Sequence, residues 1–129
     1  MKRFIKTVLT MGIALIMFGT AAFAGASYSG YNTIVGKFNG CGYSGYQTKS
    51  TGGANGYIMS TMVGGDYEVD VRMNSSKGSG SWRRDVTDGT WGELPGSSYQ
   101  TSGTSVRAQF SNDINTPVDV QVIGQWKSN

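Results

Sequence analysis

The stretch PVDVQVIGQW, residues 117–126, alternates apolar and polar side chains along most of its length. Successive side chains of an extended chain point to opposite faces, because a β-strand has a period of two residues. One face then carries Val118, Val120, Val122, Gly124 and Trp126, and the other face is mostly polar. This pattern predicts a strand with one face in an apolar core and the other mostly in water.

Two further segments show the same alternation. In TSVRAQF, residues 104–110, the inward side chains are predicted to be Val106, Ala108 and Phe110. In DYEVDVRM, residues 66–73, charged residues alternate with the predicted inward side chains Tyr67, Val69, Val71 and Met73. Both segments therefore predict half-buried strands.

The composition supports an all-β fold. Only one leucine and seventeen of the twenty glycines follow residue 26, and no segment there repeats apolar residues at helical spacing. Glycine, proline and small polar residues interrupt the chain at short intervals, as at Gly64–Gly65, Asp88–Gly89 and Pro95–Gly96. We expect a small antiparallel β-sandwich or barrel of about 6–8 short strands.

The N-terminal segment has the features of a secretory signal peptide. A basic start precedes an apolar run from Val8 to Phe18, and small residues then allow cleavage after Ala24 or after Ala26, of which the first is favoured. The apolar run is shorter than the about 20 residues that a membrane-spanning helix needs. We predict a signal peptide at residues 1–24, a single β domain at residues 25–129, and a secreted, extracellular protein without a stable membrane anchor.

Cleavage at this position changes the electrostatic interpretation. Three of the eleven Lys and Arg residues lie in the signal segment, which leaves eight against eight Asp and Glu residues. Nucleic acids and anionic membranes require a basic surface. A domain with no net charge therefore argues against a nucleic-acid partner.

The hexapeptide YSGYNT at residues 28–33 returns as YSGYQT at residues 43–48. Asn39–Gly40 lies between the copies and is a strong signal for a two-residue hairpin turn. Such a turn would pair the copies, with Thr33 opposite Tyr46 and each copy supplying one tyrosine to either face. A functional alternative is that Tyr31 and Tyr46 form an exposed aromatic strip for a sugar ring or a protein partner.

A second hairpin is predicted around Asp88–Gly89. A turn there would place Val86 opposite Trp91 and Arg84 opposite Glu93, both favourable cross-strand pairs. Trp82 and Trp91 would then share one face. That face is either part of the core or a second aromatic platform for a ligand.

The sequence offers little for catalysis. It contains no histidine, which excludes Ser-His-Asp and Cys-His arrangements and the common histidine-based zinc sites. DVTDG, residues 85–89, lacks the ligand series of an EF-hand and is interpreted as a turn. We therefore predict no catalytic residue, no metal site and no cofactor. Carboxylates such as Glu68 and Glu93 leave only a carboxylate-dependent hydrolase as a remote alternative.

Cys41 is the only cysteine. We expect it to be at least partly buried beside Phe38, because free cysteine behaves as a small hydrophobic residue. The alternative is an intermolecular disulfide. The protein is therefore expected to be a monomer or a Cys41-linked dimer.

These observations favour a small secreted, non-catalytic β module that binds the cell envelope, a polysaccharide or a protein partner. Its candidate binding residues are Tyr31, Tyr46, Trp82 and Trp91. The alternative is a secreted antagonist, either a bacteriocin-like toxin or an enzyme inhibitor. In style the chain resembles the small β-rich exoproteins of Gram-positive bacteria, a likeness that assigns no site.

Overall fold

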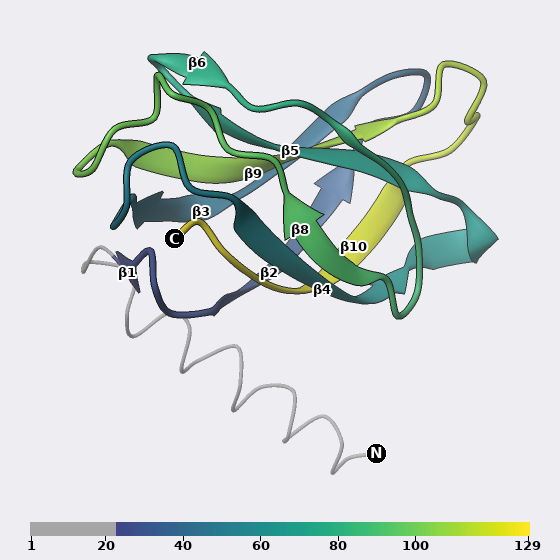
Figure 1. Ribbon diagram of the computed structural model, residues 1–129. Coiled ribbons are helices and arrows are strands. Elements are labelled where there is room, and N and C mark those ends of the chain that lie inside the picture. Colours follow the sequence, from purple (N-terminus) through teal and green to yellow (C-terminus); the bar gives the residue numbers. More distant parts are fainter. Residues whose placement is uncertain (1–22) are drawn as a thin grey trace, which may run out of the picture.

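The computed structural model describes residues 23–129, which form two β-sheets packed face to face (Figure 1). The prediction of an all-β fold is confirmed, and the architecture is a sandwich. Of ten strands, eight have at least four residues and two have only two. The predicted signal peptide lies outside the described residues, except for its last two positions.

Sheet A has the strand order β1-β3-β9-β5-β6, and β7 also pairs with β5. Its strands are β1 (Phe23–Ala24), β3 (Cys41–Thr48), β5 (Val69–Ser75), β6 (Gly78–Ser79), β7 (Arg83–Val86) and β9 (Ser105–Asn112). All of these pairings are antiparallel except that between β1 and β3.

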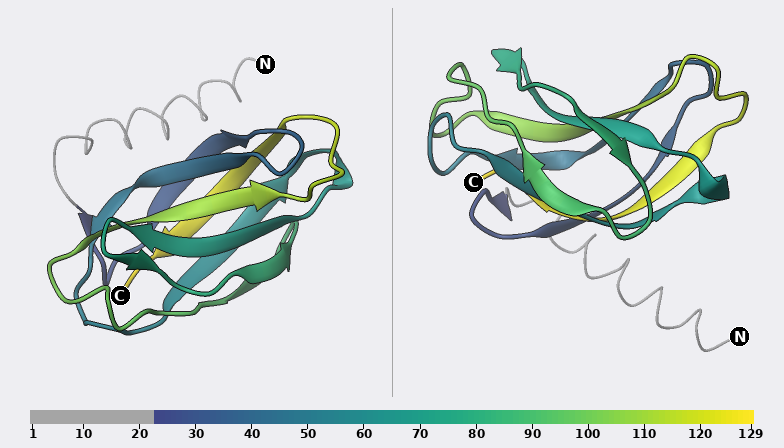
Figure 2. Two further views of the ribbon diagram at one scale, coloured as in Figure 1. Left: turned by 90° about the horizontal axis from the view of Figure 1, so that it is seen from above. Right: turned by 45° about the vertical axis from the view of Figure 1, so that its right-hand side comes forward.

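Sheet B has the order β2-β10-β4-β8 and is antiparallel throughout. Its strands are β2 (Ser29–Val35), β4 (Gly56–Val63), β8 (Trp91–Leu94) and β10 (Val120–Lys127). A short 3-10 helix, η1 (Gly64–Asp66), follows β4 and leads to β5 in the other sheet. Seen from above, the strands of the two sheets cross at an angle (Figure 2).

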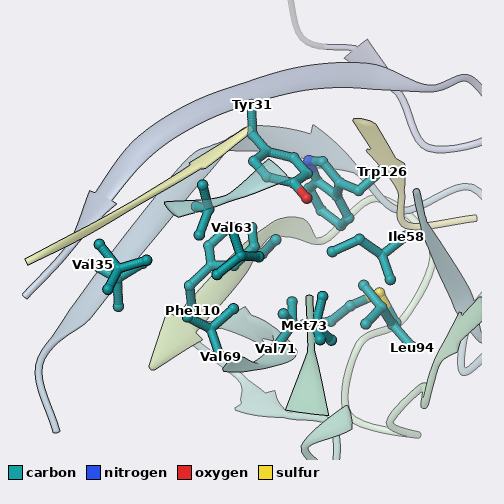
Figure 3. Packing of buried hydrophobic residues seen from close by; sticks show 14 of the residues in the cluster. Tyr31, Val35, Ile58, Val63, Val69, Val71, Met73, Leu94, Phe110 and Trp126 are labelled. Atoms are coloured by element: carbon teal, nitrogen blue, oxygen red, sulfur yellow. The ribbon is translucent and has the colours of Figure 1, made fainter. Parts of the chain in front are cut away.

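The core lies between the sheets (Figure 3). The inward residues predicted for β9 are all fully buried, as are Val122 and Trp126 of β10. Val69, Val71 and Met73 of β5 are buried as well. The alternation of apolar and polar residues therefore correctly identified the core face of all three strands.

Two residues at the ends of these strands depart from the prediction. Val118 precedes β10, which begins at Val120, and its side chain is exposed. Tyr67 precedes β5 and is only partly buried against the core. In both cases the alternation of apolar and polar residues begins in the sequence before the first residue of the strand.

The predicted hairpin between the two hexapeptides is wrong. The first copy pairs with β10, where Tyr31 lies opposite Gly124, and the second pairs with β9, where Tyr46 lies opposite Arg107. The chain crosses between the sheets because positive φ angles occur at Phe38 (55°) and Asn39 (65°), one residue earlier than the predicted turn requires. The intervening segment thus joins two layers instead of two neighbouring strands.

This crossing is held by the loop that precedes β10. The Phe38 N–H donates to the Thr116 carbonyl (2.8 Å), and the Asn39 N–H donates to the Asp113 carbonyl (3.1 Å). The two loops lie side by side at one end of the sandwich, away from β1 and the C-terminus (Figure 1). These hydrogen bonds to a distant loop explain why the Asn39–Gly40 turn signal did not determine the path of the chain.

The turn at Asp88–Gly89 is present, but its flanking strands also separate. The Thr90 N–H donates to the Thr87 carbonyl (3.1 Å), and Gly89 has a φ of 74°. However, β7 joins β5 in sheet A and β8 joins β4 in sheet B. The predicted pairs Val86–Trp91 and Arg84–Glu93 are therefore wrong, and Trp82 and Trp91 do not share a face.

Tyr31 packs into the core from sheet B, and its ring centroid lies 4.7 Å from that of Phe110 (Figure 3). Burial raises the pKa of Tyr31 to about 12, and the neighbouring Ser60 hydroxyl offsets this only in part. Between pH 10 and 12 the unfolded chain therefore loses a proton that the folded protein keeps. The resulting stabilisation is fully present below pH 10 and is lost as the pH rises through about 12.

We expect this loss to be measurable by urea unfolding at pH 9 and pH 11.5. A Tyr31 pKa of about 12 in the folded protein and 10.0 in the unfolded chain corresponds to about 2.7 kcal/mol, most of which is lost by pH 11.5. The wild type should lose about 2 kcal/mol more stability than Tyr31→Phe over this interval. Burial lowers the pKa of Lys49, whose contribution therefore rises with pH, but this contribution is common to both proteins. Equal losses in the two proteins would contradict the assignment.

Candidate binding surface

The outer face of sheet A carries two arginines among three aromatic side chains. We call the set Tyr43, Tyr46, Arg72, Trp82 and Arg107 the arginine–aromatic face. Strands β3, β9 and β5 lie side by side, and the residues of β9 and β5 that alternate with core positions point outward. Arg107 and Arg72 therefore lie on the surface opposite the core.

A β-bulge brings both tyrosines of the second hexapeptide to this face. Tyr43 lies opposite Gln109 and Tyr46 lies opposite Arg107, with a register shift between them. The Ser44 hydroxyl accepts a hydrogen bond from the Ala108 N–H (2.8 Å) inside this irregularity. Regular alternation would place residues 43 and 46 on opposite faces, so the extra residue puts the two rings side by side.

Arg107 is held between these tyrosines. Its Cζ atom lies 3.7 Å from the ring centroid of Tyr43 and 5.2 Å from that of Tyr46. Its Nε donates to Asn74 Oδ1 (3.2 Å), which fixes the orientation of the guanidinium. Both distances to the rings lie within the range of cation–π interactions.

Arg72 has an equivalent arrangement on the next strand. Its Cζ atom lies 4.3 Å from the ring centroid of Trp82, and its Nε donates to Gln109 Oε1 (2.7 Å). The Gln109 amide in turn donates to Cys41 Sγ (3.4 Å). Each arginine is thus fixed by a neutral amide and by one or two aromatic rings.

Neither arginine has an acidic partner among residues 23–129. The ion pair of this region joins Arg84 to Asp70, with Nη1 and Oδ2 2.6 Å apart. The guanidiniums of Arg72 and Arg107 are therefore uncompensated on this face. The surface is locally positive although the predicted mature domain has no net charge.

The face also has a concave part beside Tyr46. An open hollow of about 360 Å³ is lined by Tyr46, Ser76 and Ser105. Tyr46 is 52% exposed, so one ring is available at the rim of this hollow.

The four predicted binding residues are not brought together. Tyr46 and Trp82 lie on the arginine–aromatic face, whereas Tyr31 is only 4% exposed and belongs to the core. The interpretation of Tyr31 and Tyr46 as one exposed strip is therefore wrong. Trp91 is 62% exposed on β8, at the edge of sheet B.

Three residues of this face were not predicted from the sequence. Arg72 and Arg107 occupy outward positions of two correctly predicted strands, but nothing in the sequence showed that β5 and β9 are neighbours. Tyr43 was placed on the opposite face from Tyr46 because the bulge at Ser44–Gly45 carries no strong signal beyond its glycine.

Three further findings concern the cysteine, possible metal sites and possible membrane-spanning helices. Cys41 is exposed, so the expectation that it is at least partly buried is wrong. In residues 23–129, no group of three or more His, Cys, Asp and Glu side chains is arranged to hold a metal ion. The same residues contain no helix long and apolar enough to cross a membrane.

No protein-family profile matches the chain, and no curated protein sequence is similar to it.

Proposed function

We propose that the protein is a secreted, non-catalytic module that binds a polysaccharide of the cell envelope through the arginine–aromatic face of sheet A. The observation that supports this proposal is the row of stacked side chains across three adjacent strands, with Tyr46 half-exposed at a hollow. Aromatic rings present flat apolar surfaces on which sugar rings can lie, and fixed polar groups beside them supply hydrogen bonds.

The rigidity of the surface also favours a binding role. Arg72 and Arg107 are already positioned by Gln109 and Asn74, so less side-chain entropy is lost when a ligand binds. Four of the five residues of this face, including both arginines, lie on strands of a packed sheet, which keeps the donor positions constant, and Trp82 lies directly before β7. A protein partner is the alternative ligand class for the same surface.

The proposal is tested by co-sedimentation of the purified protein with isolated bacterial cell walls. We expect most of the protein to pellet, and a soluble wall polysaccharide to release it. Tyr46→Ala should weaken retention by about tenfold, equivalent to about 1.4 kcal/mol, because the exposed stacking ring is removed.

Trp91→Ala is the matched control, since it removes an exposed aromatic ring from sheet B. We expect it to change retention by less than twofold. Retention that depends on Trp91 and not on Tyr46 would place the site on the other sheet. A protein that stays in the supernatant would remove the support for envelope binding.

A further inference from the structure

We infer that the ligand of the arginine–aromatic face is an acidic polysaccharide whose sugar rings carry carboxylates. This inference rests on the proposed function and specifies the ligand class. It starts from the parts of Arg72 and Arg107 that the protein leaves unused.

In both arginines the Nε is the atom that the protein engages. Arg72 Nε donates to Gln109 and Arg107 Nε donates to Asn74, and among residues 23–129 their terminal Nη atoms have no hydrogen-bond partner. Arg84 differs, because its Nη1 is already bound to Asp70. Two guanidinium ends are therefore oriented and free to donate. The end of a guanidinium can donate two parallel hydrogen bonds to the two oxygens of a carboxylate.

The two arginines lie on neighbouring strands of sheet A. Arg72 pairs with Gln109 and Asn74 pairs with Arg107 in the antiparallel ladder, so the two arginines are diagonal neighbours. The backbone positions of such diagonal residues lie about 7–8 Å apart. Two arginines at this backbone spacing suit a polymer that repeats an anionic group along its length. When two groups of one polymer bind two sites of one protein, the second contact raises the overall affinity.

The aromatic rings favour a charged sugar over other polyanions. Tyr46 provides a half-exposed ring beside Arg107, which a linear phosphate polymer without rings would leave unused. Nucleic acids combine rings with phosphates, but their binding relies on many basic contacts, and this face has two uncompensated arginines. A uronic acid residue uses both features, with its ring on tyrosine and its carboxylate on arginine.

The experiment is calorimetric titration of the purified protein with oligogalacturonate and with alginate oligomers. The fully methyl-esterified galacturonate oligomer is the matched ligand control, because it keeps the rings and removes the charge. We expect the acidic oligomers to bind at least tenfold more tightly than the ester. We also expect their affinity to fall as the salt concentration rises.

Protein variants separate the guanidinium geometry from overall charge. Arg72→Lys and Arg107→Lys keep the charge but remove the planar fork, and each should weaken binding of the acid by about tenfold. Lys37→Gln removes one exposed positive charge from the β2–β3 crossing and should change affinity by less than twofold. The thermal unfolding of each variant is recorded to confirm that it is folded.

Equal binding of acid and ester would overturn the inference, and the proposed polysaccharide-binding role would stand if wall retention still depended on Tyr46. Tighter binding of oligouridylate than of either uronate would also overturn it, in favour of a nucleic acid. If the protein is retained by cell walls but binds neither uronate, the inference of an acidic polysaccharide fails and the proposed wall binding stands. Loss of Tyr46-dependent wall retention would instead remove the proposed function.

Discussion

Tyr31→Ala is expected to lower the free energy of unfolding by about 3–5 kcal/mol, the usual cost of truncating a large buried aromatic residue. Tyr31 is 4% exposed, and its ring packs against Phe110 from the opposite sheet. Its removal leaves a cavity between the sheets that β2 and β9 cannot close without losing other core contacts. Urea unfolding monitored by tryptophan fluorescence measures the change.

The equivalent tyrosine of the second hexapeptide provides the control. Tyr46→Ala should alter the free energy of unfolding by no more than about 0.5 kcal/mol, because Tyr46 lies on the surface of sheet A. The two substitutions occur at the same position of the repeated hexapeptide, so composition and local sequence are matched. Similar losses for both variants would contradict the separation of the copies into a core strand and a surface strand.

Gly124→Ala is expected to destabilise the protein by about 3 kcal/mol, at the upper end of the effects of overpacking a core. A Cβ atom at this position would lie 2.5 Å from the Met59 carbonyl oxygen and 2.5 Å from the Tyr31 hydroxyl oxygen. The carbonyl belongs to the neighbouring strand β4 and cannot rotate away as a flexible side chain would. Each kcal/mol lowers the melting temperature of a domain of this size by about 4–8 °C, so calorimetry will detect the change.

Gly45→Ala is the matched glycine control. A Cβ atom there would meet nothing within 4 Å, and Gly45 has no positive φ angle. We expect its melting temperature to stay close to that of the wild type. If Gly124→Ala were equally well tolerated, the close packing of Tyr31 over β10 would be wrong.

The strands that are amphipathic over their whole length were predictable from sequence. In β9 and β10 each inward residue contributes apolar area to one continuous core, so period-two alternation follows directly from burial. In β5, Asp70 follows the pattern by pointing outward, yet it is buried, and Arg84 from β7 pairs with it. Alternation predicts the face of a residue, whereas its exposure depends on neighbouring strands.

The pairing of the strands could not be predicted in the same way. Both expected hairpins contained genuine turn residues, yet in each case the chain crossed from one sheet to the other. The crossing near Phe38 depends on carbonyls of Thr116 and Asp113, about 75 residues further along the chain. A local signal gives the position of a turn but not the sheet that the next strand joins.

The candidate binding surface shows the same limit. Tyr46 and Trp82 were identified as binding candidates from their residue type, whereas Arg72 and Arg107 acquire their role only from the neighbours β5, β9 and β3. The bulge at Ser44–Gly45 then reverses the expected direction of one tyrosine relative to the other. A surface built across three strands is a property of the sheet, so single-strand patterns do not reveal it.

The most direct test of the proposed binding surface is an NMR titration of the ¹⁵N-labelled protein with solubilised cell-wall polysaccharide. We expect the largest chemical-shift changes in β3, β9 and β5, at and beside Tyr43, Tyr46, Arg72 and Arg107, and in the indole N–H of Trp82. Residues of β8 around Trp91 should be unaffected. Changes confined to sheet B, or no changes at saturating polysaccharide, would contradict the assignment of this face as the binding surface.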